Sequence, residues 1–140
     1  MKVYIKQKDG YHFEAKGASG VPVQIDASVN QESKGASPME LVLMGLGACN
    51  AMDIVGILDK QKQKITRYEI EVIGEREPVA QAKPFKSATV NILLEGEIDP
   101  GKALRAAKLS FEKYCSVSLT LEGKVEVTYT VWVNGKEVTA

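Results

Sequence analysis

A continuous apolar segment dominates the pattern of hydrophobic and polar positions along this chain. Between Leu41 and Leu58 only Asn50 and Asp53 are clearly polar. A run of this length without alternation predicts a buried α-helix rather than a strand. The segment is nearly long enough to cross a membrane, but the acid at its centre and the lack of a second hydrophobic segment beside it favour a buried helix instead.

The start of this helix is marked by a capping motif. Ser37 is an N-cap residue, Pro38 suits the first helical position, and Glu40 lies three residues after the cap. We therefore predict a helix over residues 37–62. This capping role already accounts for Glu40, so a change of Glu40 to glutamine is expected to have little effect on stability.

The predicted helix is apolar on all sides and needs cover on every face. A chain of 140 residues has little else with which to cover it, so a second subunit is the simplest source. Gly45 and Gly47 support this interpretation, because glycine costs a helix about 1 kcal/mol relative to alanine and is best explained by close backbone approach. We expect the neighbour to be a helix of a second copy, which makes the protein a homodimer.

Alternating hydrophobic and polar residues predict strands on both sides of the helix. Three short strands are expected between residues 2 and 27, the first two joined by a turn at Asp9-Gly10. After the helix, alternation over residues 68–72 and 88–94 predicts half-buried antiparallel strands. A further strand over residues 125–133 has valine and tyrosine on one face.

A second helix is predicted between the last two of these strands. Asp99 is its N-cap and Pro100 its first residue, and an apolar stripe at helical spacing ends at Cys115. The order of strands, long helix, strands, helix and strand predicts a single α+β domain over residues 1–140.

Charge and cysteine content narrow the functional classes. Eighteen basic and eighteen acidic residues balance and are scattered, which argues against a nucleic-acid partner. The first residues, MKVYIKQKDGY, contain no apolar signal segment, so we expect a cytoplasmic protein. Two cysteines in that compartment are expected to be reduced thiols rather than a structural disulfide.

Cys49 is the residue most suited to chemistry, although its surroundings in the sequence do not activate it. Cysteine attacks as the thiolate, and few free thiols are ionised at neutral pH. Cys49 lies too far along its helix for the helix dipole to help, Asp53 would oppose ionisation, and no arginine precedes Arg67. From the residues alone, an inert buried thiol is the plain alternative.

No metal or cofactor is expected. The available ligands would be Cys49, Cys115 and the single His12, which have no CxxC spacing and are too few for a zinc site.

Two segments resemble the OsmC/Ohr family of thiol peroxidases: SPMELVLMGLGACNAMDIV at residues 37–55 and EKYCSVSLTL at residues 112–121. The resemblance implies an OsmC-like fold, in which antiparallel sheets wrap around a long central helix of an intertwined homodimer. It also implies that organic hydroperoxides are reduced, with Cys49 as the peroxidatic thiol and Cys115 as the resolving thiol, and that a dithiol reductant restores both.

The chain departs from the family's peroxidases at three places. Met39 stands directly after the cap proline, where those peroxidases keep an acid, and Glu40 follows it as the candidate catalytic acid. The N-terminal region has no arginine to stabilise the thiolate, and Ser116 replaces a proline in the second motif. Two alternatives therefore stay open: a non-catalytic module that binds a small hydrophobic ligand at the dimer interface, and a structural dimer with inert thiols.

Overall fold

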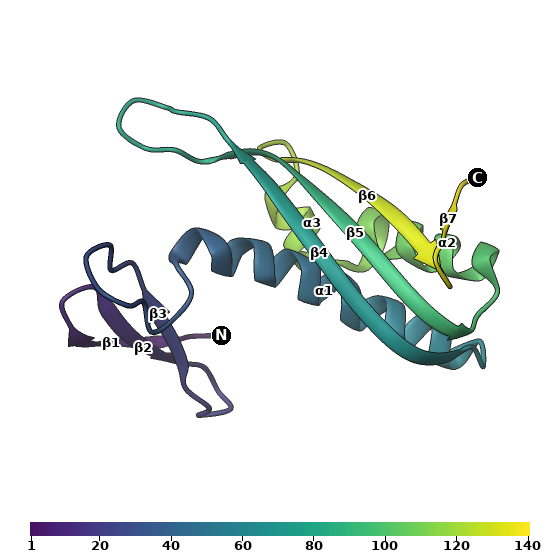
Figure 1. The fold of residues 1–140 in the computed structure, drawn as a ribbon, viewed down its shortest axis with the longest axis horizontal. Helices are drawn as coiled ribbons and strands as arrows, with labels where there is room; N and C mark the ends of the chain where they lie inside the picture. Colours follow the sequence, from purple (N-terminus) through teal and green to yellow (C-terminus); the bar gives the residue numbers. More distant parts are fainter. The chain divides into compact units, whose positions relative to one another are not determined.

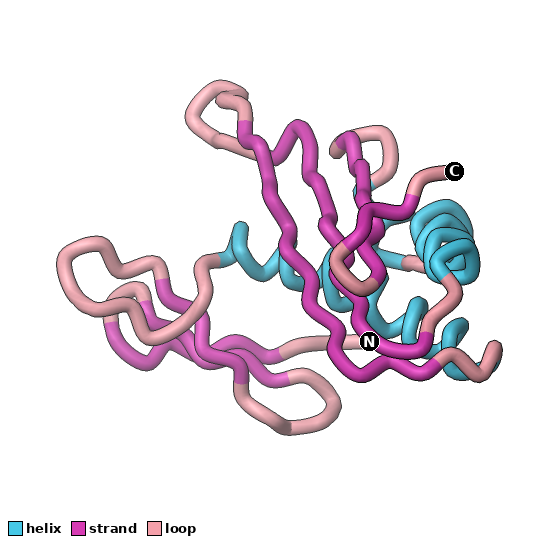
Figure 2. The backbone as a smooth tube through the Cα atoms, turned by 45° about the vertical axis from the view of Figure 1, so that its right-hand side comes forward, coloured by secondary structure: helices cyan, strands magenta, loops and turns pink.

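The computed structural model describes all of residues 1–140 and contains two sheets and one long helix (Figures 1 and 2). Contacts divide the chain into two compact units, Met1–Val42 and Leu43–Ala140, and the boundary falls inside the first helix. The elements are β1 (Tyr4–Asp9), β2 (His12–Lys16), β3 (Val23–Asp26), α1 (Pro38–Lys60), β4 (Lys64–Arg76), β5 (Phe85–Glu97), α2 (Pro100–Leu109), a π-helical turn η1 (Ser110–Tyr114), α3 (Ser116–Leu121), β6 (Glu126–Val133) and β7 (Lys136–Val138).

The first unit contains a three-stranded antiparallel sheet in the order β1-β2-β3, as the sequence predicts. The turn between β1 and β2 lies at Gly10–Tyr11, and Gly10 has a φ of +55°, a conformation that glycine adopts without steric cost. Asp26 is the one buried residue of this unit, and its carboxylate accepts hydrogen bonds from the backbone N–H groups of Ser28 and Lys34 at 2.8 and 2.9 Å. None of the unit's hydrophobic side chains is buried.

Helix α1 begins where the capping motif predicts. The Ser37 N–H donates to Glu40 Oε1 at 2.9 Å, and the Glu40 N–H donates to Ser37 Oγ at 3.2 Å, which is a reciprocal capping box. These bonds hold the pKa of the Glu40 carboxyl below its ordinary value. The helix ends at Lys60, two residues before the predicted end at position 62.

The second unit contains a four-stranded sheet in the order β4-β5-β6-β7. Strands β4 and β5 form a long antiparallel pair, as predicted, and β7 returns beside β6 after the turn at Asn134-Gly135. Strand β6 runs parallel to β5, which differs from the expected all-antiparallel sheets. The connection from β5 to β6 through the second helical region is long enough to carry the chain back to the starting edge, which a parallel pair requires.

The hydrophobic core of this unit lies between the sheet and the helices. In Figure 1, α1 runs along one face of β4 and β5, and α2 packs against β6 and β7. The fully buried side chains come from one stripe of α1, from alternate positions of β5 and β6, and from α2; they include Leu46, Ile54, Leu58, Val90, Ile92, Ala106 and Val131.

Helix α1 is buried on one side only. Within its most apolar 18-residue window, 28% of the residues are buried, although by length and composition alone the helix could span a membrane. Met44, Met52 and Val55 are exposed by 53%, 74% and 46%. The expectation of a helix buried all round therefore fails within one chain, and the exposed apolar face is the part that a second copy would have to cover.

Gly47 packs against the sheet of its own chain. A Cβ at this position would lie 2.8 Å from Val72 Cγ2 and 3.4 Å from Ile70 Cγ2. The close approach predicted for this glycine is real, but the neighbour is β4 and not a partner helix. A Cβ on Gly45 would meet no atom within 4 Å.

The second helical region is broken into three parts, where one regular helix was expected. Asp99 caps α2 as predicted, and its side chain accepts from the Lys102 N–H at 3.0 Å. The helix then widens into the π-helical turn, in which the Cys115 N–H donates to the Ser110 carbonyl at 2.8 Å. Cys115 has an extended backbone and becomes the N-cap of α3, so it does not close a continuous helical stripe.

Candidate functional site

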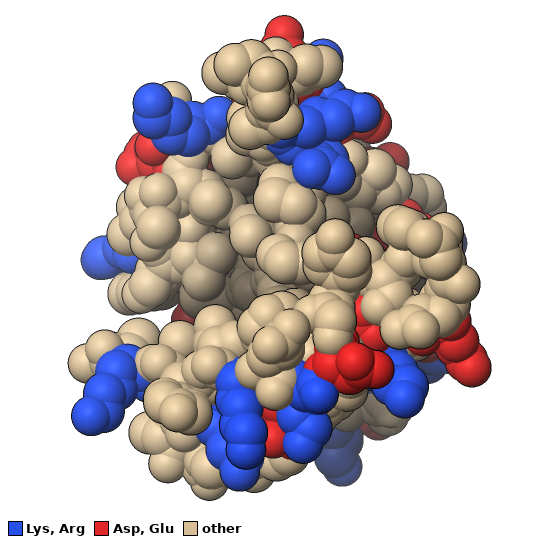
Figure 3. Space-filling model, turned by 90° about the vertical axis from the view of Figure 1, so that its left-hand side faces the viewer, with Lys and Arg blue, Asp and Glu red and all other residues tan.

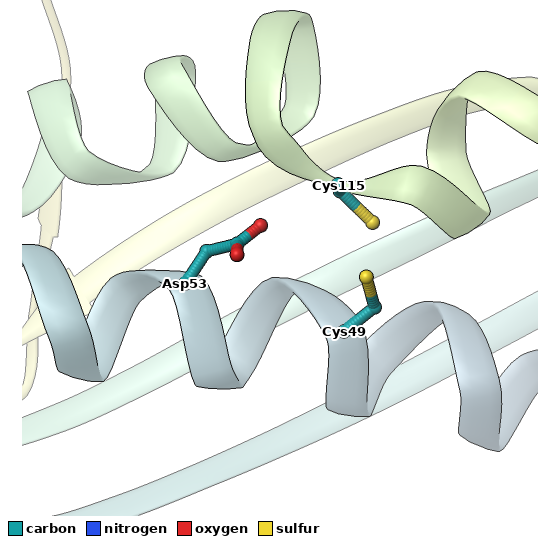
Figure 4. A group of neighbouring side chains, drawn as sticks. All are labelled: Cys49, Asp53 and Cys115. Carbon is teal, nitrogen blue, oxygen red and sulfur yellow. The ribbon is translucent and has the colours of Figure 1, made fainter.

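The two cysteines lie next to each other in the second unit. Cys49 belongs to the middle of α1, where it is half-buried, and Cys115 is 0% exposed at the junction between the π-helical turn and α3. In Figure 4 their sulfurs point toward each other across the gap between these elements. Both are free thiols.

Asp53 completes a group of three side chains. It lies one helical turn after Cys49 on the same face of α1, and Figure 4 shows its carboxylate on the same side of the helix as both sulfurs. The Sγ atoms of Cys49 and Cys115 and a carboxylate oxygen of Asp53 all lie within 4.8 Å of one another.

A buried hydrogen-bond network fixes the carboxylate of Asp53. Ser110 Oγ lies 2.8 Å from Asp53 Oδ2 and 2.7 Å from Asn50 Oδ1, and its single O–H is shared between these two acceptors. The amide nitrogen of Asn50 donates in turn to the Leu46 carbonyl at 2.9 Å and lies 3.4 Å from Ser118 Oγ. Asn50 and Ser110 are both 0% exposed, so the network ties α1 to the π-helical turn in the interior.

The π-helical turn sets the position of Cys115. Ser110 and Cys115 are five residues apart in the sequence, and the π-helical backbone joins them by a main-chain hydrogen bond. The side chains of both residues reach the site. The Ser118 N–H then donates to Cys115 Sγ at 3.2 Å as the first turn of α3 begins. Insertions of this kind are frequent at functional sites.

Burial raises the pKa of the Cys115 thiol above its ordinary value. The neighbouring Cys49 sulfur raises it further, whereas the hydrogen bonds from Ser118 act in the opposite direction. The buried thiol therefore favours its protonated form. Of the two sulfurs, Cys49 is the more accessible to a molecule from solvent.

No lysine or arginine forms a hydrogen bond or ion pair with any of the three groups. The single ion pair of the chain joins Arg67 to Glu69, on the exposed surface of β4. On the face shown in Figure 3, basic and acidic side chains occur in small separate groups rather than in one field of single sign. The site thus contains three groups that become negative on ionisation and no basic partner.

The other residues singled out from the sequence are engaged elsewhere. Glu40 is exposed and uses its carboxylate in the capping box at the start of α1. His12 belongs to β2, and its Nε2 lies 2.6 Å from Gln24 Oε1 of the neighbouring strand. Neither is among the hydrogen-bonding partners of the two thiols or of Asp53.

A groove opens beside Asp53. It has a volume of about 580 Å³ and is bounded by α1 on one side and by the end of α2 and the π-helical turn on the other. Its lining is mostly apolar, with Met52, Gly56, Ile57, Leu109 and Tyr114, and Lys60 and Gln61 stand at one end. The carboxylate of Asp53 is the acidic group of this lining.

Asn50, Ser110 and Ser118 are the site residues that the sequence analysis missed. Asn50 had a visible signal, because a polar residue in an apolar helix must find a hydrogen-bond partner when buried. Ser110 and Ser118 had none, because serines at such positions are common on exposed helix faces.

Comparison with known proteins agrees with the fold. The family model for OsmC-like proteins matches residues 31–130, a range that includes Cys49, Asp53 and Cys115. The chain belongs to the OsmC-like protein family. The resemblance seen in the two sequence segments is thereby confirmed.

One curated relative and two solved structures match nearly the full length of the chain. The protein YhfA of Escherichia coli strain K12 is 36% identical over 131 residues, which are 93% of this chain and 96% of YhfA. The OsmC-like protein of Mycoplasma pneumoniae has a TM-score of 0.80 at 15% identity and covers 94% of this chain and 95% of its own. An organic hydroperoxide resistance protein OsmC of Legionella pneumophila has a TM-score of 0.71 at 18% identity, with coverages of 95% and 98%.

The TM-scores of these two solved structures show that they share the fold of this chain. Together with membership of the OsmC-like family, the adjacent thiols support a redox role for this protein.

Proposed function

We propose that this OsmC-like protein reduces organic hydroperoxides, with Cys49 as the peroxidatic thiol and Cys115 as the resolving thiol. The observation that carries the proposal is the pairing of a half-buried sulfur with a fully buried one within 4.8 Å. The half-buried Cys49 is accessible to an incoming peroxide, and the burial of Cys115 supports a reaction with the neighbouring sulfur.

The proposed reaction has three balanced steps. The Cys49 thiolate attacks the distal oxygen of ROOH, the O–O bond breaks, and the alkoxide takes a proton to leave as ROH, which makes Cys49 a sulfenic acid. The Cys115 thiol then attacks the Cys49 sulfur, and its proton leaves with the hydroxyl group as water. The resulting disulfide is reduced by an external dithiol, which becomes a disulfide itself.

The second step requires only a small movement. Sulfurs within 4.8 Å must approach to the roughly 2 Å of a disulfide bond. Cys115 lies outside regular helix, at the boundary between the π-helical turn and α3, so a local adjustment there can bring the sulfurs together. A reducing compartment such as the cytoplasm would supply the dithiol and keep the resting thiols free.

The apolar groove beside the site supports an organic substrate over hydrogen peroxide. Its lining by Met52, Ile57, Leu109 and Tyr114 offers hydrophobic contacts to the carbon skeleton of ROOH. The same groove is the feature that a non-catalytic, ligand-binding role would use. The two roles differ in whether the thiols react.

The experiment treats the reduced protein with one equivalent of tert-butyl hydroperoxide and follows its mass. We expect a loss of two hydrogens as the Cys49–Cys115 disulfide forms, and slower reaction with hydrogen peroxide at the same concentration. The variant Cys115→Ser should accumulate a sulfenic acid, and Cys49→Ser should consume no peroxide. If Cys49 reacts no faster than a free thiol in solution, the ligand-binding role replaces this proposal.

Glu40 stays a candidate for catalysis only through the family resemblance, because its carboxylate is occupied as a helix cap. Glutamine can also serve at this capping position. We therefore expect Glu40→Gln to change both stability and peroxide turnover little. A hundredfold loss of turnover with unchanged stability would place Glu40 in the catalytic set.

A further inference from the structure

Asp53 has no task in the proposed peroxide reaction. A carboxylate beside a reactive thiol opposes formation of the thiolate, so a site built only for peroxide reduction would be expected to have a basic group there. The structure instead holds the carboxylate with the Ser110 hydroxyl, which also contacts the buried Asn50. The position of the Asp53 carboxylate is therefore fixed by a hydrogen bond that peroxide reduction does not require.

We propose that Cys49, Asp53 and Cys115 bind a thiophilic divalent cation, of the zinc class, when both thiols are reduced. Each residue offers one ligand atom, and these three atoms lie within 4.8 Å of one another. Two sulfurs and one oxygen form a donor set that suits zinc and similar ions better than magnesium or calcium, which prefer oxygen ligands.

The geometry needs little adjustment to hold such an ion. Zinc binds thiolates at about 2.3 Å and carboxylates at about 2.0–2.2 Å, so tetrahedral ligands lie roughly 3.5–3.8 Å apart. A contraction of at most about 1.3 Å from 4.8 Å therefore closes the site around the ion. Cys49 and Asp53 are one helical turn apart on α1, a spacing that presents two ligands on one face, and Cys115 arrives from the opposite side (Figure 4).

The charges of the site also favour a cation. No lysine or arginine of this chain pairs with the carboxylate or with either sulfur. A divalent ion would supply the missing positive charge and would stabilise both thiolates, which the protein alone does not do. This differs from the metal set considered from the sequence, because Asp53 takes the place that His12 cannot fill.

The outer contacts match those of metal ligands. Ligating carboxylates are commonly hydrogen-bonded by neighbouring groups, and Asp53 Oδ2 accepts from Ser110 at 2.8 Å. Cys115 Sγ accepts a backbone N–H from Ser118 at 3.2 Å, a contact that favours a negatively charged sulfur. The groove at Asp53 gives solvent access, so a water molecule can take the fourth position.

This inference does not rest on peroxide chemistry, but it links the two uses of the thiols. Metal binding requires both sulfurs as thiolates, and a disulfide removes both ligands at once. Oxidation should therefore release the ion, and the bound ion should slow oxidation of the thiols. The site would be metal-binding when reduced and metal-free when oxidised.

The test titrates the reduced protein with Co²⁺ and with Zn²⁺ in the absence of peroxide. Co²⁺ reports its ligands through thiolate-to-metal charge-transfer absorption in the near ultraviolet, and Zn²⁺ affinity follows from competition with a chromophoric chelator. We expect one ion per chain, charge-transfer bands of two thiolates, and no binding after the protein is converted to its disulfide form, whose fold is checked by circular dichroism.

Matched variants separate the ligands from general effects. Asp53→Asn keeps the shape and removes the anionic oxygen, so it should weaken Zn²⁺ at least tenfold, while Cys49→Ser and Cys115→Ser should each remove the two-thiolate spectrum. Asp59→Asn changes an exposed acid of the same helix, outside the cluster, and should leave affinity unchanged. Wild-type affinity weaker than millimolar, or Asp53→Asn binding as tightly as wild type, would overturn the proposal whether or not the protein reduces peroxides.

Discussion

The Ser110 hydroxyl donates to Asn50 Oδ1 at 2.7 Å, and both residues are completely buried. This bond connects the centre of α1 to the π-helical turn that carries Cys115. Because Asn50 Oδ1 has no access to water, it depends on the Ser110 hydroxyl for its hydrogen bond. The bond therefore links the two segments that hold the thiols.

Removing this hydroxyl should destabilise the protein. In Ser110→Ala, the buried Asn50 Oδ1 loses its donor, and leaving a buried polar atom unsatisfied costs about 1–3 kcal/mol. We expect the free energy of unfolding of the reduced protein, measured with urea, to fall by about that amount. The control Ser116→Ala removes an exposed hydroxyl and should stay within about 0.5 kcal/mol of wild type. Equal stability of the two variants would contradict the importance of the buried bond.

Two glycines of α1 should respond in opposite directions to alanine. Gly47→Ala places a methyl group 2.8 Å from Val72 Cγ2, and such overpacking typically costs about 1–3 kcal/mol. Gly45→Ala meets no atom within 4 Å and should raise stability by up to about 1 kcal/mol through the higher helix propensity of alanine. Thermal unfolding of the two variants measures both effects. If Gly45→Ala is destabilising, a second copy of the chain approaches the helix at that point.

Local sequence signals predicted most elements of the fold, for physical reasons that can be named. The capping box gave the start of α1 because Ser37 and Glu40 satisfy backbone groups within a single turn. The alternation of hydrophobic and polar residues predicted β4, β5 and β6 because each of these strands has one face toward the core. This alternation did not predict the parallel pairing of β5 with β6, because half-buried strands show the same alternation in parallel and antiparallel pairs. The long helical connection between them was the available signal.

The site was predictable only in part. Family resemblance placed the two cysteines, and four-residue spacing placed Asp53 beside Cys49. The π-helical turn could not be predicted, because a single widened turn depends on the packing of Ser110 against α1 and leaves no pattern in its own residues. The partner expected for Gly47 was wrong because sequence does not distinguish a close strand from a close helix.

The thiol of Cys115 should make the reduced protein less stable at alkaline pH. Burial raises the pKa of this thiol in the folded state, so the folded protein keeps the proton that the unfolded chain loses above about pH 8.5. Stability then falls as pH rises from about 8.5 toward the folded pKa. Cys115→Ser, whose hydroxyl does not titrate in this range, should show a shallower decline.

Measurement of unfolding free energy by urea between pH 7 and pH 10 checks this difference. Tyr68 and Tyr129, whose pKa values are also raised by burial, remain in both proteins, so their contributions cancel in the comparison. Identical slopes for wild type and Cys115→Ser would mean that the thiol is not protonated preferentially in the folded state.

Both units carry apolar surface that one chain leaves uncovered, and we propose that a second copy covers it. The first unit, which contains the three-stranded sheet, buries none of its hydrophobic side chains. Tyr4, Ile5 and Tyr11, for example, are exposed by 75%, 54% and 70%. Small sheets need a packed hydrophobic face for stability. With the exposed face of α1, this surface is of the kind that obligate dimers bury.

Sedimentation analysis of the reduced protein should therefore give a dimer at micromolar concentration. Met44→Glu places a charge on the exposed apolar face of α1 and should shift the protein toward monomer and lower its thermal stability, because the isolated chain leaves this face in water. Lys86→Glu introduces the same side chain at an exposed position of β5 and should leave the dimer intact. A wild-type protein that sediments as a stable, folded monomer at this concentration would rule out the dimer, because the exposed side chains of both units would then be tolerated in water.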